Sequence, residues 1–499
     1  MKRTISNHRL GVTATALLSA LTLGCNDGTP AGNGGSSDGS ASNTMGMTSD
    51  ATTGSTGADP GGSTSGSSNA TTASTTGVAD SGESTMGGPK FDLGGAEGGE
   101  DFDASLHGFV YGPDGEMPVS GALVYVTNTE PAGIPQGVYC AECEALADDD
   151  DWTISNADGS FDLPAHSGPG KFLVVQKGQF MRITPIIVGP QSVDLQPILT
   201  TLPDHNDPDS GLYIPLIAVA DASYDRLEDA LGKFGLGETM ITGFDEKLVP
   251  DTEQFALYDN GRPPSTDGFV SQGTLAELVL DPVQLAQYHI IFVPCSSGTY
   301  VSTLNDPTAV QNIRDWVAAG GRWYVADWSN EWLQMVFPEY QNLNGWDGSS
   351  GSADNGSYDS LATVLDDDLL EWLGALPDAY KDINPFNDDT HPAVDSLPTL
   401  MTLDNWSGID ATLPVLVDDG LGGQVDVGHK VWLEGPGGLP AAVHPLTVTG
   451  QFGCGKIQFT SYHAAEFTNT YVGLSPQELV LIYTILEIGG CQQALPPPG

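Results

Sequence analysis

The chain has 499 residues, enough for two or three domains of about 100–200 residues each. Its 65 acidic residues outnumber its 16 basic residues and give a formal net charge of −49. A surface this negative repels phosphate backbones and anionic lipid head groups, so we exclude nucleic acid as a partner and membrane docking through a basic face. The 63 glycines and 34 prolines favour strands, loops and linkers over a helical bundle.

Residues 1–25 have the pattern of a bacterial export signal. Three basic residues at the start are followed by an apolar stretch at 10–23, which is shorter than the ~20 residues needed to span a bilayer. The ending Leu-Thr-Leu-Gly-Cys resembles the lipobox of bacterial lipoproteins, which implies that Cys25 is lipidated and becomes the new N-terminus. We therefore expect an exported protein, attached to the outer membrane or cell surface by a lipid alone. The alternative is a secreted protein in which Cys25 has no special role.

Residues 26–103 form a low-complexity segment dominated by glycine, serine and threonine. Between 26 and 100 the only aromatic residue is Phe91. Such a segment cannot bury enough apolar surface to offset the entropy of ordering, so we predict a disordered tether.

Residues 104–203 carry the pattern of an all-β sandwich, with short β-rich runs separated by turn signals. The run "GFVYGPDGEMPVSGALVYV" and the later turn "SNADGSFDLP" resemble the carboxypeptidase regulatory-like, or prealbumin-like, domain. This resemblance implies a structural or binding module without catalytic residues.

Residues 204–495 alternate between apolar strands and amphipathic helices, which predicts an α/β domain with a mostly parallel, doubly wound, flavodoxin-like sheet. Strands are expected at 212–219, 288–293, 322–326 and 456–462. The segment at about 340–400 is rich in Gly, Asn, Asp and Ser, and we interpret it as an insertion with one short helix at 361–373.

This second half resembles the class I glutamine amidotransferase-like superfamily in three segments: "YHIIFVPCSSG", "IRDWVAAGGRWYVADWSNEWL" and "GCGKIQFTSYHAAEF". The resemblance puts Asp327 where the family has its cysteine nucleophile, and a carboxylate cannot act as that thiolate. His463 and Glu466 match the family's His-x-x-Glu spacing. We therefore expect a non-catalytic domain.

Cys295 supports the alternative that the protein is a hydrolase or amidase. It directly follows a predicted strand, and His463 ends another, so the two side chains could meet at the edge where open α/β sheets bind ligands. The residues before Cys295, Val293 and Pro294, are poor choices for the strained turn of a nucleophile, and a buried inert thiol is the competing interpretation.

The other cysteines form two local pairs along the chain. Cys140 and Cys143 are predicted to form a disulfide that fixes a loop, with a metal site that borrows His166 as the alternative. Cys454 precedes the strand predicted at 456–462, and Cys491 follows the returning helix predicted at 476–488. Their predicted positions therefore favour a second disulfide.

The aspartate runs at 148–151 and 366–368 and the Asn-Asp-Asp run at 387–389 lack the spacing of a calcium-binding loop and are interpreted as solvated loop charge. We predict no metal site and no cofactor. Four tryptophans near one strand end admit two interpretations, a sugar-stacking platform or core packing. They are Trp323, Trp328, Trp332 and Trp346.

The segments "GVYCAEC", "VVQKGQFMR" and "FVPCSSG", together with the tether, also resemble a family of exported myxobacterial proteins of unassigned activity. The sequence thus predicts a non-catalytic cell-envelope lipoprotein that binds a glycan, peptide or protein. The alternative is a hydrolase or amidase that uses Cys295 and His463. The oligomeric state does not follow from the sequence.

Overall fold

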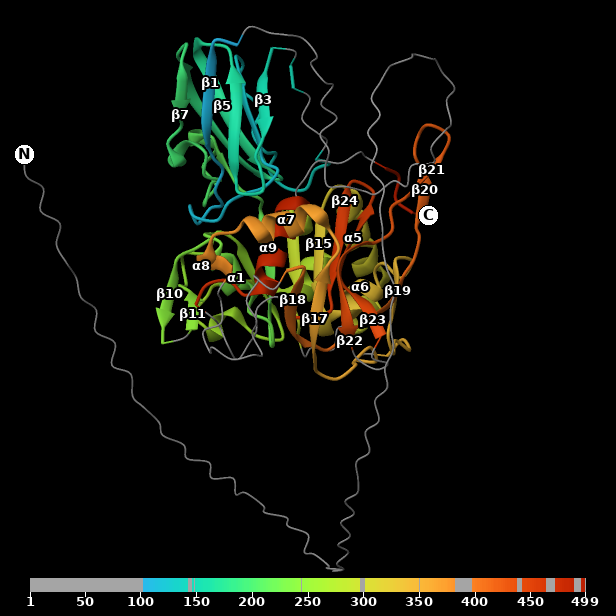
Figure 1. Ribbon diagram of the computed structural model, residues 1–499. Helices are drawn as coiled ribbons and strands as arrows, with labels where there is room; N and C mark the ends of the chain where they lie inside the picture. Colours follow the sequence, from blue (N-terminus) through green and yellow to red (C-terminus); the bar gives the residue numbers. More distant parts are fainter. Residues whose placement is uncertain are drawn as a thin grey trace, which may run out of the picture. The chain divides into compact units, whose positions relative to one another are not determined.

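The computed structural model describes residues 102–141, 146–147, 149–243, 245–296, 301–349, 351–381, 397–437, 442–463, 472–488 and 495–498 (Figure 1). The predictions for Cys25, Cys143, Glu466 and Cys491 lie outside these residues, as do those for the signal segment and most of the tether. Within the described residues, no helix is both long and apolar enough to cross a membrane.

Two β-sheets occupy the first part of the described chain (Figure 1). The three-stranded sheet has the order β4-β1-β7, with β1 (Ala104–Phe109), β4 (Ser160–Ala165) and β7 (Ser192–Asp194). The five-stranded sheet has the order β3-β2-β5-β6-β8, with β2 (Leu123–Thr127), β3 (Asp151–Ile154), β5 (Gly168–Lys177), β6 (Phe180–Val188) and β8 (Leu212–Tyr213). The expected β-rich segment is therefore present.

Alternating side chains hold these two sheets together. Leu106 and Leu163 of the smaller sheet share one buried cluster with Val124 and Val175 of the larger sheet, as the two-residue period of a strand requires. The opposite face of the larger sheet buries Tyr125 and its neighbours under the loop that follows β2.

A ten-stranded sheet dominates the remainder of the chain. Its order is β13 (Ser271–Thr274), β12 (Ala256–Asn260), β9 (Ile217–Ala222), β14 (Ile290–Val293), β15 (Arg322–Ala326), β24 (Gly455–Thr460), β23 (Ala442–Phe452), β22 (Lys430–Gly437), β17 (Tyr358–Val364) and β18 (Thr399–Asn405). The strands from β13 to β24 pair in parallel, whereas those from β24 to β18 pair antiparallel. The sheet is thus mixed, where the sequence predicted a mostly parallel one.

Three short antiparallel pairs, nine α-helices and four 3-10 helices complete the described structure. The pairs are β10 (Thr239–Thr242) with β11 (Asp245–Leu248), β16 (Gln341–Leu343) with β19 (Ile409–Thr412), and β20 (Leu416–Asp418) with β21 (Gln424–Asp426). The helices are α1 (Leu227–Lys233), α2 (Leu275–Leu280), α3 (Pro282–Leu285), α4 (Val301–Leu304), α5 (Pro307–Ala318), α6 (Glu331–Gln334), α7 (Asp367–Ala375), α8 (Asp378–Lys381) and α9 (Pro476–Ile488).

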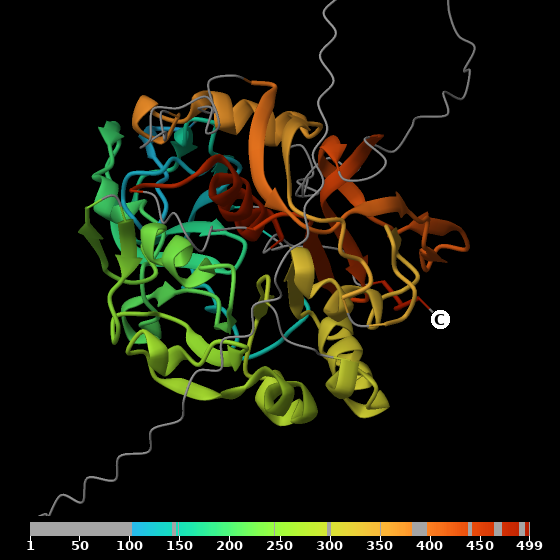
Figure 2. The same ribbon diagram turned by 90° about the horizontal axis from the view of Figure 1, so that it is seen from below.

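Helices cover both faces of the large sheet, because its central strands are apolar on both sides. Along β14, Ile290 and Phe292 face the cluster that contains α1, α7 and α9, whereas Ile291 and Val293 face the cluster that contains α2 and α5. Figure 2 shows α5 (yellow) and α9 (red) on opposite sides of the strands.

The segment expected as an insertion with one helix at 361–373 has a different local structure. Residues Tyr358–Val364 form β17 inside the main sheet, and their burial alternates with a period of two. The helix α7 begins only after Asp366, whose carboxylate accepts a hydrogen bond from the backbone N–H of Leu369. The predicted helix at 361–373 was therefore wrong in its first part, because it combined the end of β17 with the helix α7.

The antiparallel half of the sheet returns toward its parallel half. Asn405, the last residue of β18, forms an isolated antiparallel bridge with Tyr462, which follows β24. The Asn405 side chain also accepts a hydrogen bond from the Ser461 hydroxyl. This return brings Trp406 and Ser407 to the carboxyl end of β15.

A disulfide joins Cys140 to Cys454, which differs from both predicted local pairs. The loop that follows β2 lies against the amino ends of the parallel strands: Val138 N–H donates to Ala286, and the Pro135 carbonyl lies 3.0 Å from Nε2 of His289. Cys140 therefore meets the turn before β24. Sequence proximity favoured Cys143 as its partner, but this docking decides the pairing.

Candidate functional site

The carboxyl ends of four neighbouring parallel strands meet at one edge of the large sheet. From β9 the chain first adds β12 on one side and later β14 on the other, so the direction of winding reverses between β9 and β14. In open α/β sheets this reversal leaves a crevice where ligands bind. Tyr224 and Cys295 flank it, and the Tyr224 N–H donates to the Cys295 carbonyl at 3.2 Å.

Asp327 sits at the sharp turn between β15 and the short helical turn Asp327–Ser329. Its φ of +48° lies in the left-handed region, which costs a residue other than glycine about 1–2 kcal/mol. Its Oδ1 atom accepts hydrogen bonds from the backbone N–H groups of Trp406 and Ser407, at 2.9 and 2.8 Å. These bonds fix the carboxylate, which has no exposed surface.

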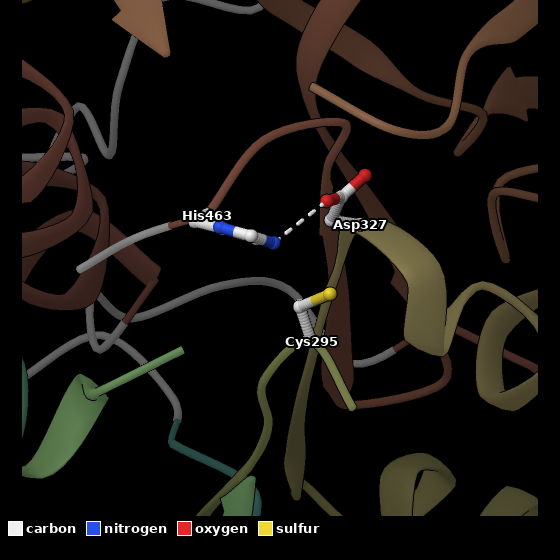
Figure 3. A group of neighbouring side chains, drawn as sticks. All are labelled: Cys295, Asp327 and His463. Carbon is white, nitrogen blue, oxygen red and sulfur yellow. Dashed lines mark ion pairs between the residues drawn. The ribbon is translucent and has the colours of Figure 1, made fainter. Parts of the chain in front are cut away.

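His463, Asp327 and Cys295 converge just beyond the ends of β24, β15 and β14 (Figure 3). His463 Nε2 lies 3.1 Å from Asp327 Oδ2, and one ligand atom from each of the three residues lies within 4.8 Å of the other two. Figure 3 shows the Cys295 sulfur and the Asp327 carboxylate on the same side of the imidazole, with the second ring nitrogen pointing away.

Burial dominates the electrostatics of this cluster. Only 1% of Cys295 is exposed, and burial raises the pKa of its thiol to about 12 although His463 acts in the opposite direction. Burial also raises the pKa of Asp327, against the hydrogen bonds that favour its charged form. Burial alone would lower the pKa of His463, but the facing Cys295 and Asp327 raise it well above its usual range.

The arrangement differs from a thiol catalytic triad. In such a triad the carboxylate orients one ring nitrogen of the histidine while the other nitrogen takes the proton of the nucleophile. Here the thiol and the carboxylate both face Nε2, and no hydrogen-bond partner of Nδ1 lies within the described residues. The geometry instead concentrates a sulfur, a nitrogen and an oxygen around one point.

A row of three aromatic rings lies beside this cluster. The Trp328 ring is 6.1 Å from that of Tyr224 and 5.8 Å from that of Trp406, with interplanar angles of 31° and 21°. Tyr224 is 37% exposed, and the two tryptophans are half-buried. We call these three residues the aromatic row.

Only some of the residues selected from the sequence lie in this site. Cys295 and His463 meet, as the hydrolase interpretation required, whereas Glu466 lies outside the described residues. Trp323 and Trp332 are buried in the core, which favours core packing for them. Trp346 packs partly against the same core, so only Trp328 of the four belongs to the aromatic row.

Sequence reasoning missed two features of the site. Tyr224 lies two residues after the end of β9, the first central strand, so the rule that ligands bind at strand ends could have selected it. Trp406 follows β18, a strand that was not predicted, and no pattern linked it to Asp327. Asp327 was interpreted as a lost nucleophile, although the parallel pairing of β15 with β24 places it beside His463.

Comparisons with known proteins give weak similarities. No protein-family model matches the chain, and no curated protein matches it significantly. Two cytoplasmic proteins from Salmonella typhimurium align at 13% and 14% identity with TM-scores of 0.27 and 0.26, covering 55% of this chain and 99% and 97% of theirs. A ThuA-like protein from Bacteroides uniformis aligns at 13% identity and a TM-score of 0.24, covering 45% of this chain and 79% of that one. With TM-scores this low, none of these alignments supports a functional argument.

Proposed function

We propose that the protein is an exported, lipid-anchored binding protein that holds a neutral glycan on the aromatic row and performs no chemistry of its own. The observation that carries this proposal is the aromatic row itself, which lies partly exposed at the winding reversal of the sheet. Aromatic faces pack against the apolar face of a sugar ring, and Tyr and Trp supply both contact area and a polar handle. The lipid anchor on Cys25 remains a prediction from the signal pattern.

Charge restricts the class of glycan. The formal net charge of −49 produces a field that repels anionic ligands and leaves neutral ones unaffected. We therefore expect uncharged oligosaccharides to bind more tightly than uronic-acid or sulfated chains of the same length. Amidotransferase-like and carboxypeptidase regulatory-like domains are consistent with such a role, because the first would supply the strand-end crevice and the second a spacer or binding module.

The binding test uses tryptophan fluorescence of the full-length chain titrated with a panel of neutral and acidic oligosaccharides. We expect saturable binding of at least one neutral member, and about tenfold weaker binding in the variant Trp328→Ala, because about 1.4 kcal/mol of stacking is lost. The control is Phe109→Ala. Phe109 is 46% exposed and also stacks on a neighbouring ring, that of Tyr111, but it lies in the small sheet. Equal affinity in the Trp328→Ala variant and the wild type would refute the proposal.

A second candidate function, a thiol hydrolase or amidase, is favoured by one observation: Cys295 and His463 lie within the same cluster. Such an enzyme needs a thiol that reagents reach in the folded state. The 1% exposure of Cys295 argues against this. Timed alkylation of the native chain distinguishes the two functions, because the binding protein reacts at Cys295 only after unfolding, whereas the enzyme reacts in its folded form.

A further inference from the structure

We propose that Cys295, Asp327 and His463 form a binding site for Zn²⁺ or a similar borderline divalent metal ion. This inference goes beyond glycan binding and does not depend on it. It rests on the convergence of three ligand atoms from three distant segments, and on the lack of partners outside the cluster for the buried Asp327 and His463 atoms among them.

The spacing of the ligand atoms suits a tetrahedral ion. Zinc bonds of about 2.0–2.1 Å to nitrogen or oxygen and about 2.3 Å to sulfur place neighbouring ligand atoms roughly 3.3–3.6 Å apart. His463 Nε2 and Asp327 Oδ2 are 3.1 Å apart, and the three ligand atoms lie within 4.8 Å of one another. Side-chain movements of Cys295 and His463 that together total at most about 1.2–1.5 Å would bring all three atoms into the first coordination shell.

The few partners of the polar atoms point to the same ion. Asp327 Oδ2 and His463 Nε2 are both buried and lie 3.1 Å apart, and within the described residues neither has a hydrogen-bond partner outside the cluster. The other carboxylate oxygen is held by two backbone N–H groups, so Oδ2 is the oxygen that faces the cluster. Buried polar atoms with so few partners are costly, and a cation placed between them and the thiol would coordinate all three at once.

The donor set selects the kind of metal. Mg²⁺ and Ca²⁺ prefer shells of oxygen ligands, which this cluster does not offer. One thiolate, one imidazole and one carboxylate form a mixed set that suits Zn²⁺, and three protein ligands leave a fourth position for water or a bound ligand. The backbone is strained at the same place, since Asp327 adopts the left-handed conformation despite its cost.

Cobalt substitution provides a direct test. The full-length chain is treated with a chelator, exchanged into buffer with excess Mg²⁺ to saturate the acidic surface, and titrated with Co²⁺. We expect one equivalent to give the visible bands of tetrahedral Co²⁺ and a thiolate charge-transfer band in the near ultraviolet, and Zn²⁺ should displace it. The variant Cys295→Ser should lose the charge-transfer band and bind Zn²⁺ at least about 100-fold more weakly.

Two further variants test whether His463 is a ligand of the metal ion. His463→Gln should abolish the tetrahedral bands. The control His205→Gln removes an exposed histidine, paired with Asp204, and should leave them unchanged. Circular dichroism of each variant confirms that it folds, and the wild type should melt at a higher temperature with Zn²⁺ than without it, whereas Cys295→Ser should not. Spectra of octahedral Co²⁺ only, or equal Zn²⁺ affinity in Cys295→Ser and wild type, would overturn the site while leaving glycan binding intact.

Discussion

Removal of the Cys140–Cys454 disulfide should lower the stability of the chain substantially. The bond closes an interval of 314 residues and so restricts the conformations of the denatured chain. The chain-entropy relation gives an upper limit of about 5–6 kcal/mol for the resulting stabilisation of the folded state. Measured effects of disulfides fall below this limit, so we expect the double variant Cys140→Ser/Cys454→Ser to lose about 2–5 kcal/mol in its free energy of unfolding.

Urea denaturation followed by circular dichroism measures this loss. Each single serine variant should cost nearly as much as the double variant, because either one breaks the bond. Peptide mapping without reductant should recover the peptides of Cys140 and Cys454 as one linked species. A loss below about 1 kcal/mol, or a map that pairs Cys140 with Cys143, would refute the reasoning that loop docking decides the pairing.

Two further predictions concern burial and backbone space. Burial raises the pKa of Asp221 to about 7 despite two nearby arginines, so between about pH 4 and pH 7 the folded state binds more protons than the unfolded state. The free energy of unfolding should therefore fall as the pH rises through that window. In Asp221→Asn, urea denaturation at several pH values should show this fall reduced by up to about 1.4 kcal/mol per pH unit. An unchanged pH dependence would contradict the assignment to Asp221. Gly320→Ala should destabilise the chain by at least about 2 kcal/mol, because the new Cβ would lie 1.9 Å from the Tyr139 carbonyl oxygen. Gly348→Ala is the control in the same assay, because Gly348 also has a positive φ but a Cβ there would meet no other atom within 4 Å. Equal losses of stability in the two variants would contradict the predicted clash at Gly320.

Local pattern was sufficient for much of the fold. The strand at Arg322–Ala326 and the helix at Pro476–Ile488 lie where apolar runs and periodicity placed them. The strands β22 and β23 were not predicted. Glycine, proline and polar residues interrupt their apolar residues, and their stability comes from pairing with distant strands.

Part of the candidate site could also be predicted from local sequence, and part depends on distant contacts. Cys295 and His463 could be selected because each closely follows a predicted strand of a parallel sheet, and such ends share one edge. The contact of Asp327 with Trp406 could not be predicted, since it requires β18 to return to β24. The same holds for Cys140, whose partner is set by how a loop docks and not by sequence distance.

The most direct test of the proposed function is saturation-transfer NMR on the full-length chain with a neutral oligosaccharide selected from the binding panel. Saturation of the aromatic protons should pass to the C–H groups on the apolar face of one sugar ring, and Trp406→Ala should reduce this transfer strongly while Phe109→Ala leaves it unchanged. Absence of transfer from every neutral oligosaccharide in the panel, or transfer that is equal in wild type and Trp406→Ala, would contradict a glycan-binding role for the aromatic row.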